Sequence, residues 1–155
     1  MKKINLKGGF TLIELLVVVA IIAILVSVVL AALNSARGKG ADAGVKANLS
    51  NAIRQGEIFY NSNTVAPDTY TNVCINGVIG GTQGVGVLVL AAAQAVGLSG
   101  YATNTTGTNT TATCNDSVSA WAAEVPLKGG GMWCVDSTGK SKPENNTFGA
   151  LTSCV

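Results

Sequence analysis

The sequence predicts an α+β fold in which a long N-terminal helix packs on a small antiparallel β-sheet. Two observations indicate the helix: an aliphatic run begins after residue 10, and an amphipathic stretch without proline follows it. The sheet is indicated by strand-like segments between glycine-rich turns near the C-terminus. We expect a leader at 1–9, a transmembrane half of the helix at 10–33, an outer half at 34–60 and a globular head at 61–155.

The composition excludes several classes of protein. Of 155 residues, 48% are hydrophobic and 12% are charged, which suits one domain joined to an apolar segment. Histidine, the commonest general base and a common zinc ligand, is absent, so we expect no enzyme, no metal and no cofactor. A net charge of +2 provides no basic stripe, and we predict no nucleic-acid partner.

The apolar run is long enough to cross a membrane. Residues 15–33 contain one polar side chain, Ser27, and as a helix they would span roughly 28 Å, close to the ~30 Å hydrocarbon core. Lys2, Lys3 and Lys7 precede the run and would keep its start in the cytoplasm. An ordinary secretory signal is the alternative, but its apolar region is usually shorter and carries no carboxylate like that of Glu14.

Residues 7–15 read KGGFTLIEL and lead directly into the aliphatic run. This segment resembles the class III signal of type IV pilins and pseudopilins. The resemblance implies that a prepilin peptidase cleaves between Gly9 and Phe10 and methylates the new N-terminal Phe10. It further implies that the retained helix anchors the subunit in membrane lipid and later packs in the core of a homopolymeric filament. An assembly ATPase and an inner-membrane platform protein are the other implied partners.

Glu14 is the candidate assembly residue. Cleavage would expose an α-amine on Phe10, which is cationic near neutral pH and lies one helical turn before Glu14. The carboxylate could neutralise the start of its own helix, or the amine of a neighbouring subunit shifted along a filament axis. The second arrangement would give Glu14 a role in subunit registration. In an ordinary anchor, the glutamate would only cap the helix.

The outer half of the helix carries an apolar stripe formed by Val45, Leu49, Ala52, Ile53, Phe59 and Tyr60. This stripe should be buried under the head. Gly38, Gly40 and Gly44 lie just beyond the apolar run, and each costs about 1 kcal/mol relative to alanine in a helix. They mark either a place where the helix bends or melts, or a place where another helix packs closely.

In the head, we predict a buried helix near 85–98 and an exposed threonine-rich loop at 99–111, of which only Tyr101 joins the core. Strands are predicted at 117–127, 132–136 and 148–155. The expected turn is at 137–139, and Trp121 and Trp133 should pack toward the helix. Asp116, Asp136 and Glu144 lack the spacing of a calcium loop, so we expect no calcium site.

Four cysteines, an even number without close pairs, indicate disulfides and an oxidising compartment. The sequence leaves three connectivities open. We prefer Cys134–Cys154, because it would tie the last residues to a strand and resembles the C-terminal disulfide loop of many pilins. Cys74–Cys114 then follows by elimination.

The expected function is structural. The chain would be a single-pass membrane protein with an extracytoplasmic head, and after cleavage it would polymerise into a type IV pilus or a related surface filament. The alternative within the same resemblance is a pseudopilin of a type II secretion or DNA-uptake pseudopilus. A membrane-anchored extracytoplasmic binding module is the alternative from a different class.

Overall fold

The computed structural model describes residues 9–144 and 149–155. Lys2, Lys3, Lys7, the rest of the leader before Gly9, and the predicted strand start at Phe148 therefore lie outside the described residues. The chain divides into two compact units between Arg37 and Gly38. We call residues 9–37 the anchor unit and residues 38–155 the head unit, and describe each by itself.

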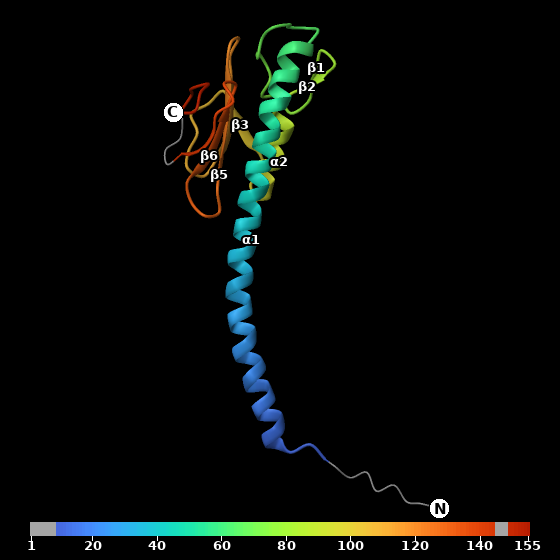
Figure 1. Cartoon of the computed structure of the whole chain (residues 1–155), viewed down its shortest axis with the longest axis vertical. Coiled ribbons are helices and arrows are strands. Elements are labelled where there is room, and N and C mark those ends of the chain that lie inside the picture. The colour runs from blue at the N-terminus through green and yellow to red at the C-terminus, as the bar shows by residue number, and fades with distance from the viewer. Residues whose placement is uncertain (1–8, 145–148) are drawn as a thin grey trace, which may run out of the picture. The chain divides into compact units, whose positions relative to one another are not determined.

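One helix, α1 (Leu12–Ser62), runs through 51 residues (Figure 1). Its outer half buries one face, because the buried residues recur every three or four positions. These residues are Val45, Leu49, Ala52, Gly56 and Phe59. The predicted stripe is therefore buried, although Ile53 and Tyr60 are only partly covered.

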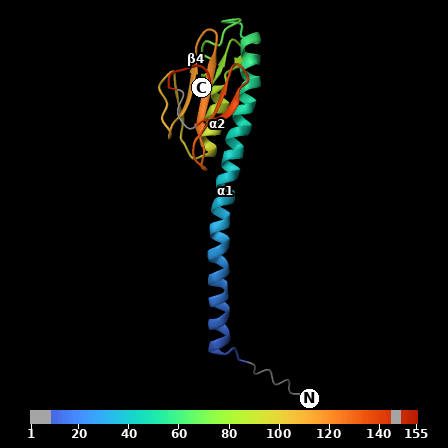
Figure 2. The same cartoon turned by 60° about the vertical axis from the view of Figure 1, so that its left-hand side comes forward.

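A short antiparallel hairpin and a second helix follow α1. The hairpin pairs β1 (Val78–Ile79) with β2 (Thr82–Gln83), and its turn residues Gly80 and Gly81 both have positive φ, which glycine adopts without strain. The helix α2 (Gly86–Ala95) lies inside the range predicted for a buried helix. Figures 1 and 2 both show α2 beside the outer half of α1.

The remaining strands form one five-stranded sheet in sequence order. They are β3 (Tyr101–Thr103), β4 (Ala112–Asp116), β5 (Trp121–Pro126), β6 (Met132–Asp136) and β7 (Ser141–Glu144). β3 pairs with β4 in parallel, and every other neighbouring pair in this sheet is antiparallel. The structure confirms the predicted α+β class, a long N-terminal helix packed on a mainly antiparallel sheet.

The two faces of this sheet are covered differently. Trp121, Ala123 and Val125 of β5 belong to the main core together with the buried residues of α1 and α2. Ala122, between Trp121 and Ala123, belongs instead to a small separate cluster with Cys134 and Cys154. Because side chains alternate along a strand, one face packs on the helices and the other faces residues near the C-terminus.

Trp121 explains why a glycine stands in the buried stripe of α1. The indole is fully buried, and a Cβ placed on Gly56 would lie 2.6 Å from its Nε1. Only a residue without a side chain allows the helix and the ring to approach this closely. The predicted packing of Trp121 toward the helix is present in the structure, and Trp133 is partly buried against the same core.

Gly44 and Gly40 of α1 differ in how closely other residues approach them. A Cβ on Gly44 would meet Ala95 Cβ of α2 at 3.5 Å, whereas a Cβ on Gly40 would have no neighbour within 4 Å. α1 continues without interruption through both positions. The structure therefore favours close helix packing at Gly44.

Two strand predictions were wrong. Residues 149–155 form turns and bends, not a strand, and the last strand of the sheet is β7. Residues 117–120 form a turn before β5, in which the Ser117 amide donates to the carbonyl of Ala120 at 2.8 Å. Neither β4 nor β3 was predicted, although Tyr101, the first residue of β3, packs on the core as expected.

The outer edge of the sheet is formed by β7. Pro143 lies opposite Trp133 and has no amide hydrogen, and Lys142 lies opposite Cys134. β7 has four residues, and β3 at the opposite edge has three. Both edges are therefore short.

Candidate processing and assembly site

The peptide bond predicted for cleavage lies before the first residue of α1. Gly9 and Phe10 have no helical structure, and Phe10 is 82% exposed. A Cβ on Gly9 would have no neighbour within 4 Å. Among the described residues, nothing covers the Gly9–Phe10 bond, which is consistent with the predicted cleavage there.

Glu14 caps the start of its own helix through Thr11. Its Oε2 accepts a hydrogen bond from the Thr11 amide at 2.9 Å and another from the Thr11 hydroxyl at 2.7 Å. In return, the Glu14 amide donates to Thr11 Oγ1 at 3.2 Å. This reciprocal pair is a capping box, and it satisfies backbone donors that a helix start leaves unpaired. A capping glutamate was one of the two predicted roles of Glu14, whereas the role of Thr11 was not predicted, although the spacing Thr-x-x-Glu is a signal for it.

The apolar part of α1 is the one helix of the described residues that is long and apolar enough to cross a membrane. Its most apolar window has a mean hydropathy of 3.3, and none of that window is buried. A core helix of a globular protein would be mostly buried. This segment therefore has the length, composition and exposure expected of a membrane-anchoring helix.

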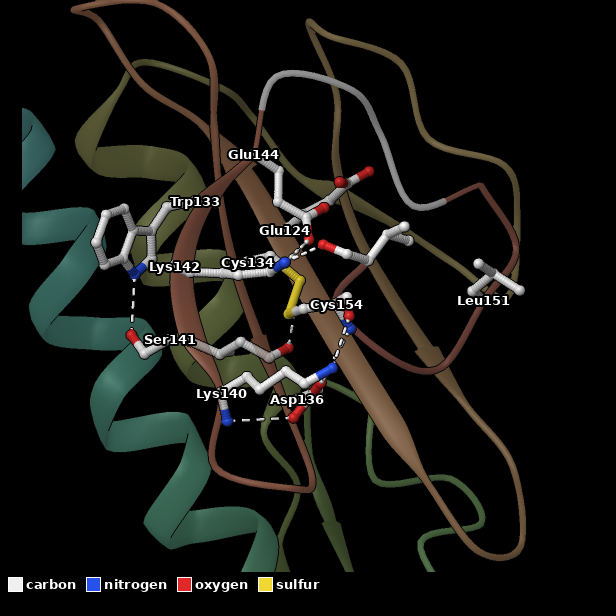
Figure 3. The surroundings of a disulfide bond; sticks show 12 residues. Glu124, Trp133, Cys134, Asp136, Lys140, Ser141, Lys142, Glu144, Leu151 and Cys154 are labelled. Carbon is white, nitrogen blue, oxygen red and sulfur yellow. Dashed lines mark hydrogen bonds and ion pairs between the residues drawn. A yellow bond between two sulfur atoms is a disulfide. The ribbon is translucent and has the colours of Figure 1, made fainter.

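The second site is the segment 149–155, which we call the strap (Figure 3). A disulfide joins Cys134 of β6 to Cys154 of the strap. Asn115 of β4 holds the other end, because its Nδ2 donates to the carbonyls of Gly149 at 3.1 Å and Leu151 at 3.3 Å. The strap thus covers the sheet face that the helices leave free.

Asp136 binds the strap to the turn between β6 and β7. Its Oδ2 accepts from the Cys154 amide at 2.9 Å, and its Oδ1 accepts from the Thr138 amide and hydroxyl and from the Lys140 amide. Burial acts to raise the pKa of Asp136, but these hydrogen bonds outweigh it, so the pKa lies below its ordinary value. Sequence analysis missed this role, although Asp-Ser-Thr-Gly is a typical turn sequence.

The second disulfide joins Cys74 to Cys114 of β4. Both disulfides have the pairing that the sequence analysis preferred. Tyr101 lies beside this disulfide, because its hydroxyl donates a hydrogen bond to the backbone carbonyl of Cys74 at 2.6 Å. Burial first, and the charge of Asp116 second, raise the pKa of Tyr101. Tyr101 therefore stays protonated and able to donate.

The described residues offer poor ligands for a metal. Cys134, Glu144 and Cys154 form the one group of possible ligand atoms within 4.8 Å of one another, but the two sulfurs are bonded together and provide no thiolate. Asp116 and Asp136 do not join Glu144 in such a group. Asp116 instead accepts from the Asn72 amide and from Asn104 Nδ2.

A family model of the prokaryotic N-terminal methylation motif matches residues 4–30. No curated protein and no solved structure matches the chain. The motif, directly before an apolar helix long enough to cross a membrane, supports a class, the type IV pilin-like and pseudopilin precursors. The match supports the type IV pilin and pseudopilin family for this chain, and that family is structural, not catalytic.

Proposed function

We propose that this chain is a pilin, a subunit that polymerises into a type IV pilus or a related helical filament after its leader is removed. The observation that carries this proposal is the position of the matched motif, directly before an apolar helix that finds no cover within the chain. A filament core made of such helices would bury them, and membrane lipid would cover them before assembly.

The capping box suggests how Glu14 works in this proposal. In the single chain, Thr11 supplies two donors to the carboxylate, so Glu14 enters the membrane with its charge partly satisfied. After cleavage, the methylated amine of Phe10 on a neighbouring subunit is a stronger, cationic partner for it. The exchange from Thr11 to that amine would register each subunit against the next.

The strap favours a pilus over a secretion pseudopilus. It closes a C-terminal loop through Cys134–Cys154, and in this respect it resembles the disulfide loop of many pilins. The major pseudopilins of secretion systems generally lack that loop. A prepilin peptidase, an assembly ATPase and a platform protein are the partners that this function requires, and the head would face the extracytoplasmic side.

Intact mass of the protein from membranes tests the proposal. We expect the wild type to have lost residues 1–9 and gained one methyl group on Phe10. Gly9→Val should leave the precursor uncut and unassembled, because the branched side chain blocks the peptidase at the cleavage site. Gly100→Val is the matched control, since Gly100 is also exposed and unhindered, and this variant should be processed normally. An uncut wild type in membranes would instead indicate an anchored binding module.

A further inference from the structure

A carboxylate lies beside one of the two disulfides of the head. Glu144, the last residue of β7, points toward the Cys134–Cys154 bond, and one of its oxygens and the two sulfurs lie within 4.8 Å of one another (Figure 3). All three residues are buried. Among the described residues, no comparable group contains Cys74 or Cys114. The two disulfides therefore have different surroundings.

The Glu144 carboxylate lacks hydrogen-bond donors while this disulfide is closed. Among the described residues, neither of its oxygens accepts a hydrogen bond, and both are buried. The ammonium of Lys142 lies 3.6 Å from Oε1 and donates a hydrogen bond to the backbone oxygen of Val155. A buried carboxylate without donors raises the free energy of the state that contains it. The disulfide cannot supply a donor, because its sulfurs carry no hydrogen.

Opening the disulfide would supply the missing donor. Each cysteine thiol has one S–H group, and both Sγ atoms already lie close to Glu144. The strap would keep Cys154 in this position after the bond opens, because Asp136 accepts from the Cys154 amide at 2.9 Å and Lys140 donates to the Cys154 carbonyl at 3.0 Å. Glu144 therefore stabilises the dithiol state relative to the disulfide state. A disulfide whose reduced form is stabilised is more easily reduced.

Cys154 is the sulfur that an external thiol can reach more readily. Its neighbours Ser153 and Val155 are exposed, and the strap has no helix or strand. Cys134, in contrast, lies inside β6, which is paired on both sides. Local opening of a segment without secondary structure costs less free energy than opening of a sheet. An external thiol would therefore attack at Cys154.

We propose that Cys134–Cys154 is a redox-exchangeable disulfide tuned by Glu144, and that Cys74–Cys114 is a fixed structural one. The thiolate of an external thiol or dithiol attacks Cys154 Sγ, and the bond to Cys134 Sγ breaks. Cys134 leaves as a thiolate, takes up the proton that the attacking thiol has lost, and donates a hydrogen bond to Glu144. A second external thiolate attacks the mixed disulfide and releases Cys154, which is protonated in the same way. Two electrons thus pass from the external sulfurs, which become a disulfide, to the two cysteines.

A redox titration of the mature full chain in detergent micelles tests this assignment. The protein is equilibrated with set ratios of reduced to oxidised dithiothreitol, free thiols are blocked with N-ethylmaleimide, and peptide mapping counts each disulfide separately. In the wild type, Cys134–Cys154 should open while Cys74–Cys114 stays closed and the head stays folded by circular dichroism. Glu144→Gln should need a ratio about tenfold higher, equivalent to about 30 mV, to open the same bond.

The second disulfide is the internal control, and its opening ratio should be the same in wild type and variant. Glu144→Leu removes every acceptor and should shift the ratio for Cys134–Cys154 at least as far as Glu144→Gln. Equal ratios for the wild type and both variants would overturn the role of Glu144. A shift of both disulfides together would mean that Glu144 acts only through head stability, and opening of Cys134–Cys154 only when the head unfolds would make that bond purely structural. Either result contradicts the inference, and neither depends on filament assembly.

Discussion

The two halves of α1 differ in whether their side chains are buried within the chain. In residues 12–33, every side chain is exposed, and the one hydrogen-bonded carboxylate binds to its own helix start. In residues 38–62, one face of the helix is buried against α2 and the sheet. The buried positions on this face include Gly56, where only a glycine leaves room for the Trp121 ring. One half therefore depends on molecules outside the chain for cover, while the other is stabilised within the head unit.

This difference implies that function and stability are separable along a single helix. Substitutions in the first half should change processing or assembly and leave the unfolding of the head unchanged. Substitutions in the second half, the sheet or the strap should lower head stability and leave cleavage unchanged. The following predictions test that separation.

The largest effect is expected at Glu14. Glu14→Leu should insert and be cleaved, yet reduce filament number by about tenfold or more, because the neighbouring amine is left without a partner. Glu14→Gln keeps the capping geometry and loses the charge. Electron microscopy of sheared filaments should show both variants equally defective. Normal assembly of Glu14→Gln would mean that capping, not charge pairing, is what the residue supplies.

Loss of either disulfide should destabilise the head. The bridges span 40 residues for Cys74–Cys114 and 20 for Cys134–Cys154, so loop entropy predicts losses of about 3.9 and about 3.3 kcal/mol respectively. The paired Cys→Ser variants can be compared by denaturant unfolding of the mature protein. If either variant also blocked removal of the leader, the separation between the two halves would fail.

Gly56 and Gly40 form a matched pair on the same helix. Gly56→Ala should lower the free energy of unfolding by about 1–2 kcal/mol, because a Cβ collides with the Trp121 ring despite its better helix propensity. Gly40→Ala meets no neighbour and should raise that free energy by up to about 1 kcal/mol. If both variants change the free energy of unfolding in urea by the same amount, the contact between position 56 and Trp121 does not contribute to stability.

A smaller effect with a distinct pH dependence is expected at Asp136. Asp136→Asn should lower stability by about 1–2 kcal/mol at neutral pH, because the amide nitrogen that replaces one carboxylate oxygen cannot accept, and one set of donors loses its acceptor. The pKa of Asp136 is lower in the folded state than in the unfolded state, so the ionised carboxylate stabilises the fold above the unfolded pKa of about 3.9. That stabilisation is lost as the pH falls through the folded pKa. Wild type and variant should therefore converge in acid. Asp68→Asn, at an exposed turn position, is the control and should unfold with the same free energy as the wild type at neutral pH.

The elements predicted well are those whose signal is local. α1 carries an unbroken aliphatic run and then a helical stripe, and β6 spans the predicted residues between two turns. Their physical causes, periodicity and turn chemistry, can be read within a short window. The capping box between Thr11 and Glu14 is equally local, because the spacing Thr-x-x-Glu can be read from four residues.

The strap shows what a local pattern cannot supply. Its spaced apolar residues suggested a strand, but Leu151 is 53% exposed, and the path of the segment depends on Cys134, Asp136 and Asn115. These partners lie far away in sequence, on the two strands β4 and β6. Likewise, β3 has only three residues, which lie in a threonine-rich stretch. It forms a strand because it pairs with β4.

In the proposed function, the edge strand β7 affects how neighbouring membrane-stored subunits avoid aggregation before assembly. A membrane holds such heads at high local concentration, where open sheet edges are the usual route to amyloid-like aggregation. β7 carries Pro143, which cannot donate to another strand, and β3 at the other edge is very short. Contacts between heads through their sheet edges are thereby discouraged, so the proposed membrane store of subunits would resist aggregation before assembly.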